Sequence, residues 1–289
     1  MAFAEFRKIT WPRDAAELLR VSILDVQRFK DDMGKHGGAP KTINRRISSL
    51  SSFYKFLSGA VAELRLPITV PNPAHAQFIA REAWDPVEEP RALSKMRARR
   101  LLALVTDESV IALRDRAILK FYAYYGARIE TGCQLSVSDF FQDGDGAAVR
   151  FHLKGGRTRT KGLHYAAADA IKAAGIESGS LFRPARSPHS VELAERRMSQ
   201  RAMYTLLMEY LARLPGAMQE RLLPSGEKVQ VCVYSPHSLR ATTATPLLDA
   251  GEPIECVQDL LDHKHITTTQ IYDNRRRSVR DSASHKVPI

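Results

Sequence analysis

The sequence predicts a mainly α-helical protein with a small antiparallel β-sheet, divided into an all-helical N-terminal domain and an α+β C-terminal domain. Apolar residues recur at helical spacing from Pro12 to about Leu66, and a proline-rich stretch without periodic pattern follows. Two strand-like segments then interrupt the helical patterns of the second half. A chain of 289 residues is long enough for two modest domains, each with its own core. We assign residues 1–82 to the first domain, 83–93 to a linker and 94–289 to the second domain.

Two amphipathic helical patterns fill the N-terminal half. The first has apolar residues at Ala15, Leu18, Leu19, Ile23, Val26 and Phe29, and the turn signal at 34–40 ends it. The apolar face of the second consists of Ile43, Ile47, Leu50, Phe53 and Leu57. Its other faces carry the cations Lys41, Arg45, Arg46 and Lys55. Such a helix can pack on a core while its basic side binds phosphates, although ordinary solvated charge explains the pattern equally well.

The middle of the chain begins with a segment, Pro67 to Pro90, that is rich in proline and has no periodic pattern. It predicts an interdomain linker with one short helix. Helical patterns follow at 94–105 and 110–125. The second of them carries an apolar stripe formed by Ile111, Leu113, Ala117, Ile118 and Phe121.

Two short strands are predicted at 147–153 and 162–166, joined by a turn that contains glycine. Four cations gather in this turn: Lys154, Arg157, Arg159 and Lys161. Further helical patterns cover residues 167–174, 199–214, 238–250 and 254–261. Pro246 lies inside the third of them, where we expect a kink or an early end.

The composition argues against several classes of protein. A formal net charge of +11 and a pI near 9.7 favour a polyanionic partner, nucleic acid first, although a merely basic protein is an equal alternative on charge alone. No segment approaches the roughly 18 apolar residues of a membrane span, so we expect a cytoplasmic protein. Cys133, Cys232 and Cys256 are odd in number and far apart, which indicates neither a disulfide framework nor a zinc site.

The segments 235–248 and 260–273 carry the most specific pattern in the chain. The first contains His-x-x-Arg at the start of a helical pattern, and the second contains a histidine after two leucines and then Thr-Thr-x-x-Tyr. Together they resemble the C-terminal signature of the tyrosine site-specific recombinases, the phage integrase and Xer group. The resemblance places His237, Arg240, His263 and Tyr272 on the chemically active positions of that family.

Upstream blocks resemble the same family in the same order. Residues 124–139 are similar to its Thr-Gly-Leu-Arg-Ile-Ser-Glu block, which places the first catalytic arginine at Arg128. The turn that begins at Lys154 resembles its Gly-Lys-Gly-x-Lys-x-Arg turn and places the catalytic lysine there. A weaker likeness over residues 42–57 implies a helical core-binding domain of the SAM-like type, followed by a catalytic domain.

Three departures from the family pattern stand near these positions. Thr131 replaces a usual glutamate, Asp262 replaces the glycine before the active-site histidine, and Ala241 replaces a common histidine or lysine. None of them removes a reacting group. Asp262 is a carboxylate next to an imidazole, so it bears on the turnover rate more than on the mechanism.

The residue types suit transfer of a DNA phosphodiester to a phenol. Two guanidiniums, Arg128 and Arg240, can clamp the charged oxygens of the transition state. Lys154, on a hairpin near DNA, is a candidate general acid for the leaving 5′-oxygen, although Arg157, Arg159 and Lys161 share its turn. Tyr272 is then the nucleophile and His237 its base. The resemblance implies that His263 hydrogen-bonds the scissile phosphate.

The resemblance further implies a DNA recombinase that works through a 3′-phosphotyrosine without ATP, metal or other cofactor, because arginines neutralise the charge. The expected partners are double-stranded DNA, sister subunits in a synaptic homotetramer formed from free monomers, and accessory DNA-bending proteins. When bound to DNA the protein would be associated with the nucleoid. Besides the catalytic residues, the candidate DNA contacts are Lys41, Thr42, Arg45, Arg46, Arg157, Arg159 and Lys161.

Other functions are compatible with parts of the pattern. A type IB topoisomerase-like relaxing enzyme shares the phosphotyrosine chemistry, and a non-catalytic DNA-binding regulator could retain the fold. Asp262, His263 and His265 resemble metal ligands, but the recombinase pattern already accounts for His263. Taken singly, Tyr272 would be a packed aromatic and Arg128 a surface cation, and only their joint spacing indicates catalysis.

Overall fold

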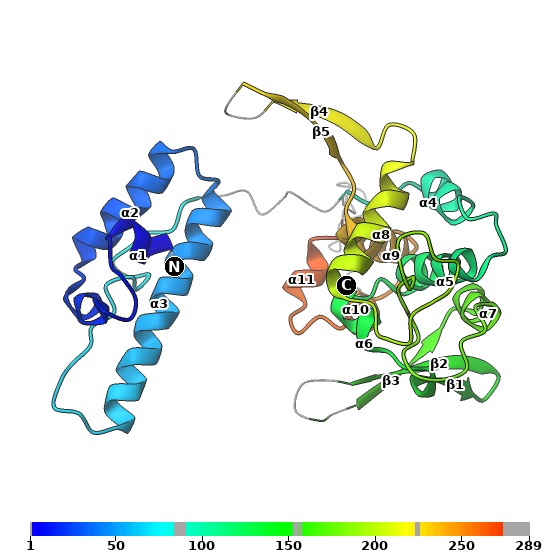
Figure 1. The fold of residues 1–289 in the computed structure, drawn as a ribbon, viewed down its shortest axis with the longest axis horizontal. Helices are drawn as coiled ribbons and strands as arrows, with labels where there is room; N and C mark the ends of the chain where they lie inside the picture. The colour runs from blue at the N-terminus through cyan, green and yellow to red at the C-terminus, as the bar shows by residue number, and fades with distance from the viewer. Residues whose placement is uncertain (1, 84–90, 153–155, 157, 223–225, 274–289) are drawn as a thin grey trace, which may run out of the picture. The chain divides into compact units, whose positions relative to one another are not determined.

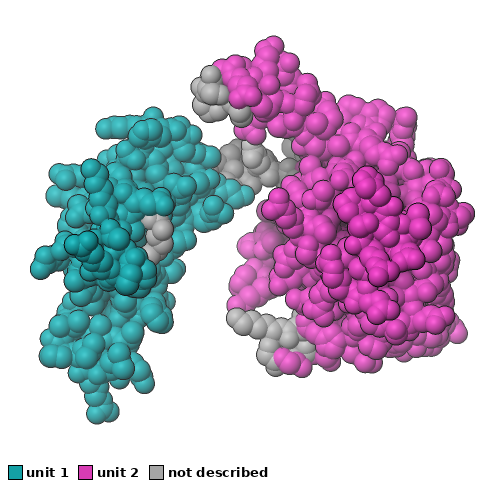
Figure 2. Space-filling view, in the orientation of Figure 1, with its two compact units in different colours: residues 1–86 teal, residues 87–289 magenta. Residues whose placement is uncertain are grey.

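The structure is a computed structural model that describes residues 2–83, 91–152, 156, 158–222 and 226–273. The chain forms two compact units, residues 1–86 and 87–289 (Figures 1 and 2). The predicted linker at 83–93 falls largely outside the described residues and stays a prediction. Each unit has its own cluster of buried apolar side chains. The prediction of a mainly helical chain with a small antiparallel sheet is confirmed, and a second sheet of two strands is present that the sequence does not predict.

Unit 1 is helical throughout its regular elements. It contains α1 (Ala2–Phe6), the 3₁₀-helix η1 (Ala15–Arg20), α2 (Ile23–Lys35) and α3 (Pro40–Glu63). α2 begins at a capping box, in which the Ser22 hydroxyl accepts from the amide of Asp25 and the Asp25 carboxylate accepts from the amide of Ser22. α3 begins with a proline. Proline has no backbone N–H, but the first turn of a helix offers no backbone acceptor for that N–H, so no hydrogen bond is lost.

The segment after α3 does not have the character predicted for it. Val70, Ala74 and Ile79 are buried in the core of unit 1. Asn44 of α3 fixes its end, because the side-chain amide donates to the Glu82 carbonyl at 2.9 Å and accepts from the Glu82 amide at 2.8 Å. The interpretation of Pro67 to Pro90 as linker is therefore wrong for residues 67–83, and the short helix is not found in that range. A few apolar side chains suffice to pack an irregular segment.

Unit 2 is built around α5 (Val110–Tyr125), a helix that is buried on most of its faces. α7 (Tyr165–Ala173) and α9 (Pro236–Asp249) pack against it. The remaining helical elements of the unit are α4 (Lys95–Leu102), α6 (Ile129–Gln134), η2 (Val137–Asp139), α8 (Gln200–Ala212), α10 (Ile254–Leu261) and α11 (Thr267–Gln270). The Ser109 hydroxyl caps the start of α5, and Gly126 in the left-handed conformation ends it.

The main sheet has three antiparallel strands in sequence order, β1 (Phe140–Asp143), β2 (Gly146–His152) and β3 (Thr158–Leu163). Val149 faces both Phe140 of β1 and Lys161 of β3. The predicted strand at 162–166 is wrong in its bounds: pairing begins at Thr158, and α7 already begins at Tyr165. Ladder pairing with β2 extends the strand into the polar turn. Lys154 and Arg157 lie outside the described residues.

A second hairpin, β4 (Met218–Leu222) and β5 (Lys228–Cys232), extends beyond the helices of its own unit (Figure 1). α9 follows it and continues through Pro246 to Asp249, so the predicted early end is wrong. An interior proline costs about 3 kcal/mol or more. The flanking Ala244 and Leu248 are completely buried, and their packing maintains the helix across the missing backbone bond.

Candidate active site

The candidate site in unit 2 contains a buried arginine. Arg240 of α9 is 4% exposed, and its Nη1 donates to the Gly126 carbonyl at 2.7 Å. Its Nη2 donates to the Leu261 carbonyl, and its Nε donates to His263 Nε2 at 3.3 Å. Burial, and then the charge of Arg128, lower the pKa of Arg240 to about 10, which leaves it protonated at neutral pH. The guanidinium is thus held in one orientation by the end of α5 and by the turn after α10.

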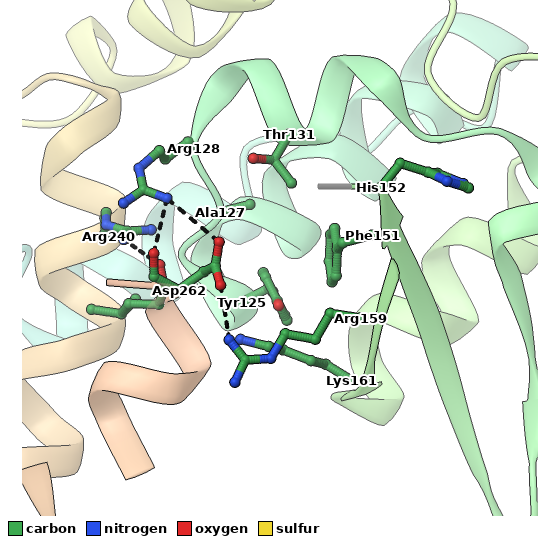
Figure 3. Close-up of a pocket in the computed structure, with 11 residues that line it drawn as sticks. Tyr125, Ala127, Arg128, Thr131, Phe151, His152, Arg159, Lys161, Arg240 and Asp262 are labelled. Atoms are coloured by element: carbon green, nitrogen blue, oxygen red, sulfur yellow. Dashed lines mark hydrogen bonds and ion pairs between the residues drawn. The ribbon is translucent and has the colours of Figure 1, made fainter. Parts of the chain in front are cut away.

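Arg128 approaches the same turn from the N-cap position of α6. Its Nη1 donates to the backbone carbonyl of Asp262 at 3.1 Å and lies 3.8 Å from a carboxylate oxygen of Asp262. In contrast to Arg240, its side chain is about half exposed, at 47%. Figure 3 shows the two arginines on adjacent sides of Asp262. The guanidinium of Arg240 is therefore fixed inside the protein, whereas that of Arg128 can bind an anion that arrives from the solvent.

Gly126 couples the end of α5 to this pair. Its φ of 66° lies in the left-handed region, and its carbonyl accepts from Arg240. A Cβ here would lie 2.9 Å from Leu261 Cδ2 and 3.0 Å from Thr243 Oγ1.

We therefore expect Gly126→Ala to destabilise the folded state by about 1–3 kcal/mol through strain and overpacking. Thermal unfolding should show a lower midpoint. Gly144→Ala is a matched control, because Gly144 also has positive φ, 56°, but a Cβ there would meet nothing within 4 Å. An equal loss in both variants would contradict the packing argument.

His263 is buried immediately after Asp262, and both of its ring nitrogens have protein partners. Nε2 accepts from Arg240, so the bonding pattern assigns the ring proton to Nδ1, which lies 2.9 Å from Thr269 Oγ1. Burial, and then the charges of Arg240 and Arg128, lower the pKa of His263 to about 4. The imidazole is therefore neutral at neutral pH. To bind a phosphate oxygen, as the sequence predicts, one of these hydrogen bonds must be exchanged.

This depressed pKa gives a stability prediction. In the unfolded chain an ordinary histidine binds a proton below about pH 6.5, whereas folded His263 resists protonation down to about 4. Below pH 6.5 the unfolded state therefore binds more protons, and folding stability should fall as the pH falls through that window, by on the order of 2 kcal/mol. Urea unfolding at pH 7 and pH 5 would measure it, and His263→Asn should show a smaller drop. An equal drop in this variant would contradict the assignment.

Tyr272 lies beside His263 at the C-terminal end of the described chain. The two rings are nearly parallel, with centroids 6.0 Å apart, and the tyrosine is 5% exposed within a cluster that includes Ala244 and Leu261. Burial raises the pKa of the Tyr272 phenol, while the charge of Arg240 and a hydrogen bond with it act in the opposite direction. The phenol is thus neutral, and its hydroxyl lies on the side of the buried guanidinium of its own chain.

A pocket opens beside these groups. It is lined by Tyr125, Ala127, Arg128, Thr131, Phe151, His152, Arg159, Lys161, Arg240, Leu261 and Asp262 (Figure 3). The structure thus brings together four of the sequence-predicted residues from distant segments on its wall, two of them the catalytic arginines. His263 and Tyr272 do not line the pocket, and both contact Arg240. His237 is exposed in the first turn of α9, one helical turn before Arg240.

Two of the predicted DNA contacts on β3 have carboxylate partners. Arg159 Nη1 donates to Asp262 Oδ1 at 2.9 Å, and Nη2 pairs with Asp259. Lys161 is nearly buried, its ammonium contacts the Asp259 carbonyl and lies 3.6 Å from the Asp259 carboxylate, and burial lowers its pKa. Motif spacing does not indicate this role of Asp259 and Asp262, since the partners are about 100 residues apart in the chain.

His152 was also missed as a site residue. Its Nε2 lies 2.7 Å from Asp139 Oδ1, and the other oxygen of this buried carboxylate accepts from the Ser136 amide and hydroxyl. The pair anchors the end of β2 at the last described residue before Lys154. No signal in the sequence links His152 to Asp139. The alternation of apolar and polar residues along β2 does not show that a residue of η2 is the partner of His152.

In unit 1, the basic side of α3 is directed away from its core. Lys41, Arg45 and Arg46 are exposed, and Thr42 is half-buried. Arg45 and Arg46 border a surface hollow that is also lined by Phe3, Phe29 and Leu50. The arrangement suits contact with a phosphate backbone, and these four residues stay predicted DNA contacts.

Within the described ranges, no group of three or more histidine, cysteine, aspartate or glutamate side chains is arranged to hold a metal ion. The metal-ligand alternative for Asp262, His263 and His265 gains no support, because both nitrogens of His263 are engaged with Arg240 and Thr269. Among the described helices, none combines the length and apolar character required to cross a membrane.

Comparisons with known proteins agree in sequence and in fold. Residues 91–278 match the phage integrase family. A tyrosine recombinase XerC of Syntrophus aciditrophicus is 31% identical over 279 residues, 92% of this chain and 81% of that protein. XerC of Bacillus subtilis is 26% identical over 86% of this chain and 75% of its own.

Two solved structures share the fold at low identity. XerH recombinase in a post-cleavage complex with a palindromic difH substrate has a TM-score of 0.63 at 15% identity, covering 87% of this chain and 68% of its own. A lambda integrase dimer bound to a COC′ core site has a TM-score of 0.55 at 16% identity, covering 89% and 65%.

Proposed function

This chain belongs to the phage integrase family, and from that premise we propose that it is a site-specific tyrosine recombinase that cleaves and rejoins double-stranded DNA. One observation carries the proposal: Arg128 and Arg240 line one pocket, and His263 and Tyr272 of the same chain lie next to Arg240, although Arg128 and Tyr272 are 144 positions apart in the sequence (272 minus 128). A tyrosine buried only for packing has no need of two nearby guanidiniums.

In the proposed first step, the Tyr272 hydroxyl attacks the scissile phosphorus and forms a 3′-phosphotyrosyl ester. The bond from phosphorus to the 5′-oxygen breaks, and Lys154 donates a proton to that oxygen. His237 takes the phenolic proton. Arg128 and Arg240 stabilise the additional negative charge on the non-bridging oxygens, so the scheme requires no cofactor. Attack by a 5′-hydroxyl of a partner strand reverses these bond changes and releases the tyrosine.

The geometry gives each described residue a specific share in this step. Arg240 is already oriented by three protein acceptors, so it loses little freedom when the transition state forms. Neutral His263 places its ring against Tyr272 and its Nε2 against Arg240, so it orients both. Because burial raises the pKa of Tyr272, the phenol needs a base, which is the role assigned to His237.

The DNA is held by both units in this proposal. In unit 1 the backbone contacts are Lys41, Thr42, Arg45 and Arg46 of α3, and in unit 2 they are Arg157, Arg159 and Lys161. Four subunits synapse two sites, with accessory DNA-bending proteins where the site requires them. The reaction takes place on nucleoid DNA in the cytoplasm.

Trapping of the covalent intermediate tests this function. Duplexes that tile the DNA flanking the gene, each with a nick that lets the released 5′-end diffuse away, should accumulate a protein–DNA adduct that survives denaturation. Efficient relaxation of supercoiled plasmid without any such site would instead favour a topoisomerase. If no duplex yields an adduct although the protein binds DNA, the chain is a non-catalytic regulator.

A further inference from the structure

The Asp262 carboxylate lies where an anion would bind. Its two oxygens are 3.8 Å from Nη1 of Arg128 and 2.9 Å from Nη1 of Arg159 (Figure 3). All three side chains are partly exposed, at 47% for Arg128, 43% for Arg159 and 39% for Asp262, and all three line the pocket. A carboxylate and a phosphate group present similar paired oxygens to guanidinium groups.

The backbone at this position does not require a carboxylate. Asp262 ends α10 in the left-handed conformation, with φ 54° and ψ 48°. Glycine adopts this conformation without strain, and asparagine and aspartate are the side-chain-bearing residues that tolerate it best. The hydrogen bond from Arg128 to the Asp262 carbonyl depends only on the backbone. The carboxylate therefore adds a charge to a turn that could form without it.

We propose that the Asp262 carboxylate is an internal competitor of the DNA phosphate, occupying Arg128 and Arg159 until DNA displaces it. The idea rests on the proposed function, since it assumes that Arg128 binds a phosphate oxygen. Asp262 thereby sets how tightly this pocket holds DNA, and it weakens binding to duplexes that make few other contacts.

The size of the effect follows from the exposure of the ion pairs. Solvent screens charges that are about half exposed, so each pair contributes little, and releasing two of them should change affinity by about three- to tenfold. Arg159 keeps a second partner in Asp259, which is why Arg128 should gain most of the freed charge. Arg240 has a smaller part in the competition. Its guanidinium donates to Gly126, Leu261 and His263, and the charge of Asp262 is the smallest of the influences on its pKa.

The test is the affinity of full-length Asp262→Asn and Asp262→Gly for a duplex of arbitrary sequence over a range of salt concentrations. Asp249→Asn is the matched control, because it removes one negative charge from the exposed end of α9. We expect both Asp262 variants to bind about three- to tenfold tighter than this control, with a steeper dependence on salt that reflects about one additional phosphate contact. Thermal unfolding of each variant confirms that the turn has folded.

A double-mutant cycle assigns the gain to one arginine. In an Arg128→Ala background, Asp262→Asn should lose most of its advantage over Asp249→Asn. Affinity equal to or below that of the control, or an unchanged gain without Arg128, would overturn the inference. The affinity measurement needs no cleavage, so the two hypotheses can fail separately. Absence of a covalent adduct would refute the recombinase function but not the competition between Asp262 and phosphate. An adduct together with unchanged affinity in the Asp262 variants would refute the competition but not the recombinase function.

Discussion

Tyr272→Phe is expected to abolish covalent attachment of DNA, lowering the yield of trapped adduct by at least about a thousandfold. The substitution removes the attacking oxygen and nothing else that reacts. The ring should remain in place, because it packs in the cluster with Leu248 and Val257 and lies parallel to His263. DNA affinity should therefore change little. The thermal midpoint should fall slightly, because the hydrogen bond between the phenol and Arg240 is lost, at about 0.5–1.5 kcal/mol. Adduct yield on a nicked duplex, measured after denaturation, gives the result directly.

A matched control separates loss of the nucleophile from loss of a hydroxyl elsewhere. Tyr204→Phe removes the same atom from a half-exposed tyrosine of α8 and should leave adduct formation unchanged. If Tyr272→Phe retained adduct formation, another side chain would be the nucleophile. Arg240 and His263 would then serve only to hold Tyr272 in the fold.

The helices that periodicity predicts well are those with a buried face and clear end signals. α5 begins and ends where the sequence predicts, because Ser109 can cap its first turn and Gly126 can adopt the left-handed conformation that ends it. α10 is predicted equally well, since its buried Val257 and Leu261 are four residues apart. Here the local signal and the tertiary packing agree.

Elements that depend on tertiary contacts were not predicted. Every residue of β4 is exposed, so this strand has no burial alternation to reveal it. α6 has only six residues, including Gly132, which packs so closely on the Tyr122 hydroxyl that a Cβ would clash with that oxygen. Residues 67–83 look like a linker by composition, yet a few of their side chains are buried in unit 1. None of these contacts is visible along the chain.

The site residues were predicted from motif spacing, and their environment was not. Spacing identifies Arg240 and Tyr272 but does not reveal that the first is buried or that His263 is neutral. It predicts Arg159 as a DNA contact and gives no sign that the fold pairs this side chain with Asp262. Sequence separation hides such pairs, and an ion pair cannot be predicted without knowing which surfaces meet. The role of Lys154 stays a prediction.

Arg240→Ala is expected to reduce the rate of adduct formation by about a hundred- to a thousandfold, the loss typical of removing one preorganised donor to a transition-state oxyanion. It should also destabilise the fold. The carbonyls of Gly126 and Leu261 would lose a buried donor, at about 1–3 kcal/mol for each group left unsatisfied. Single-turnover cleavage with saturating protein, well below the thermal midpoint, measures the rate, and thermal unfolding measures the stability.

Arg240→Lys separates the two effects. Lysine keeps the positive charge, but its single ammonium cannot reproduce a planar fork that reaches Gly126, Leu261 and His263 together. If the fork geometry matters, the lysine variant should cleave about ten- to a hundredfold more slowly than the native chain even where it is folded. If charge alone matters, the native rate should return in the lysine variant. A normal rate in the alanine variant would remove Arg240 from the chemistry and leave it only a structural role at the end of α5.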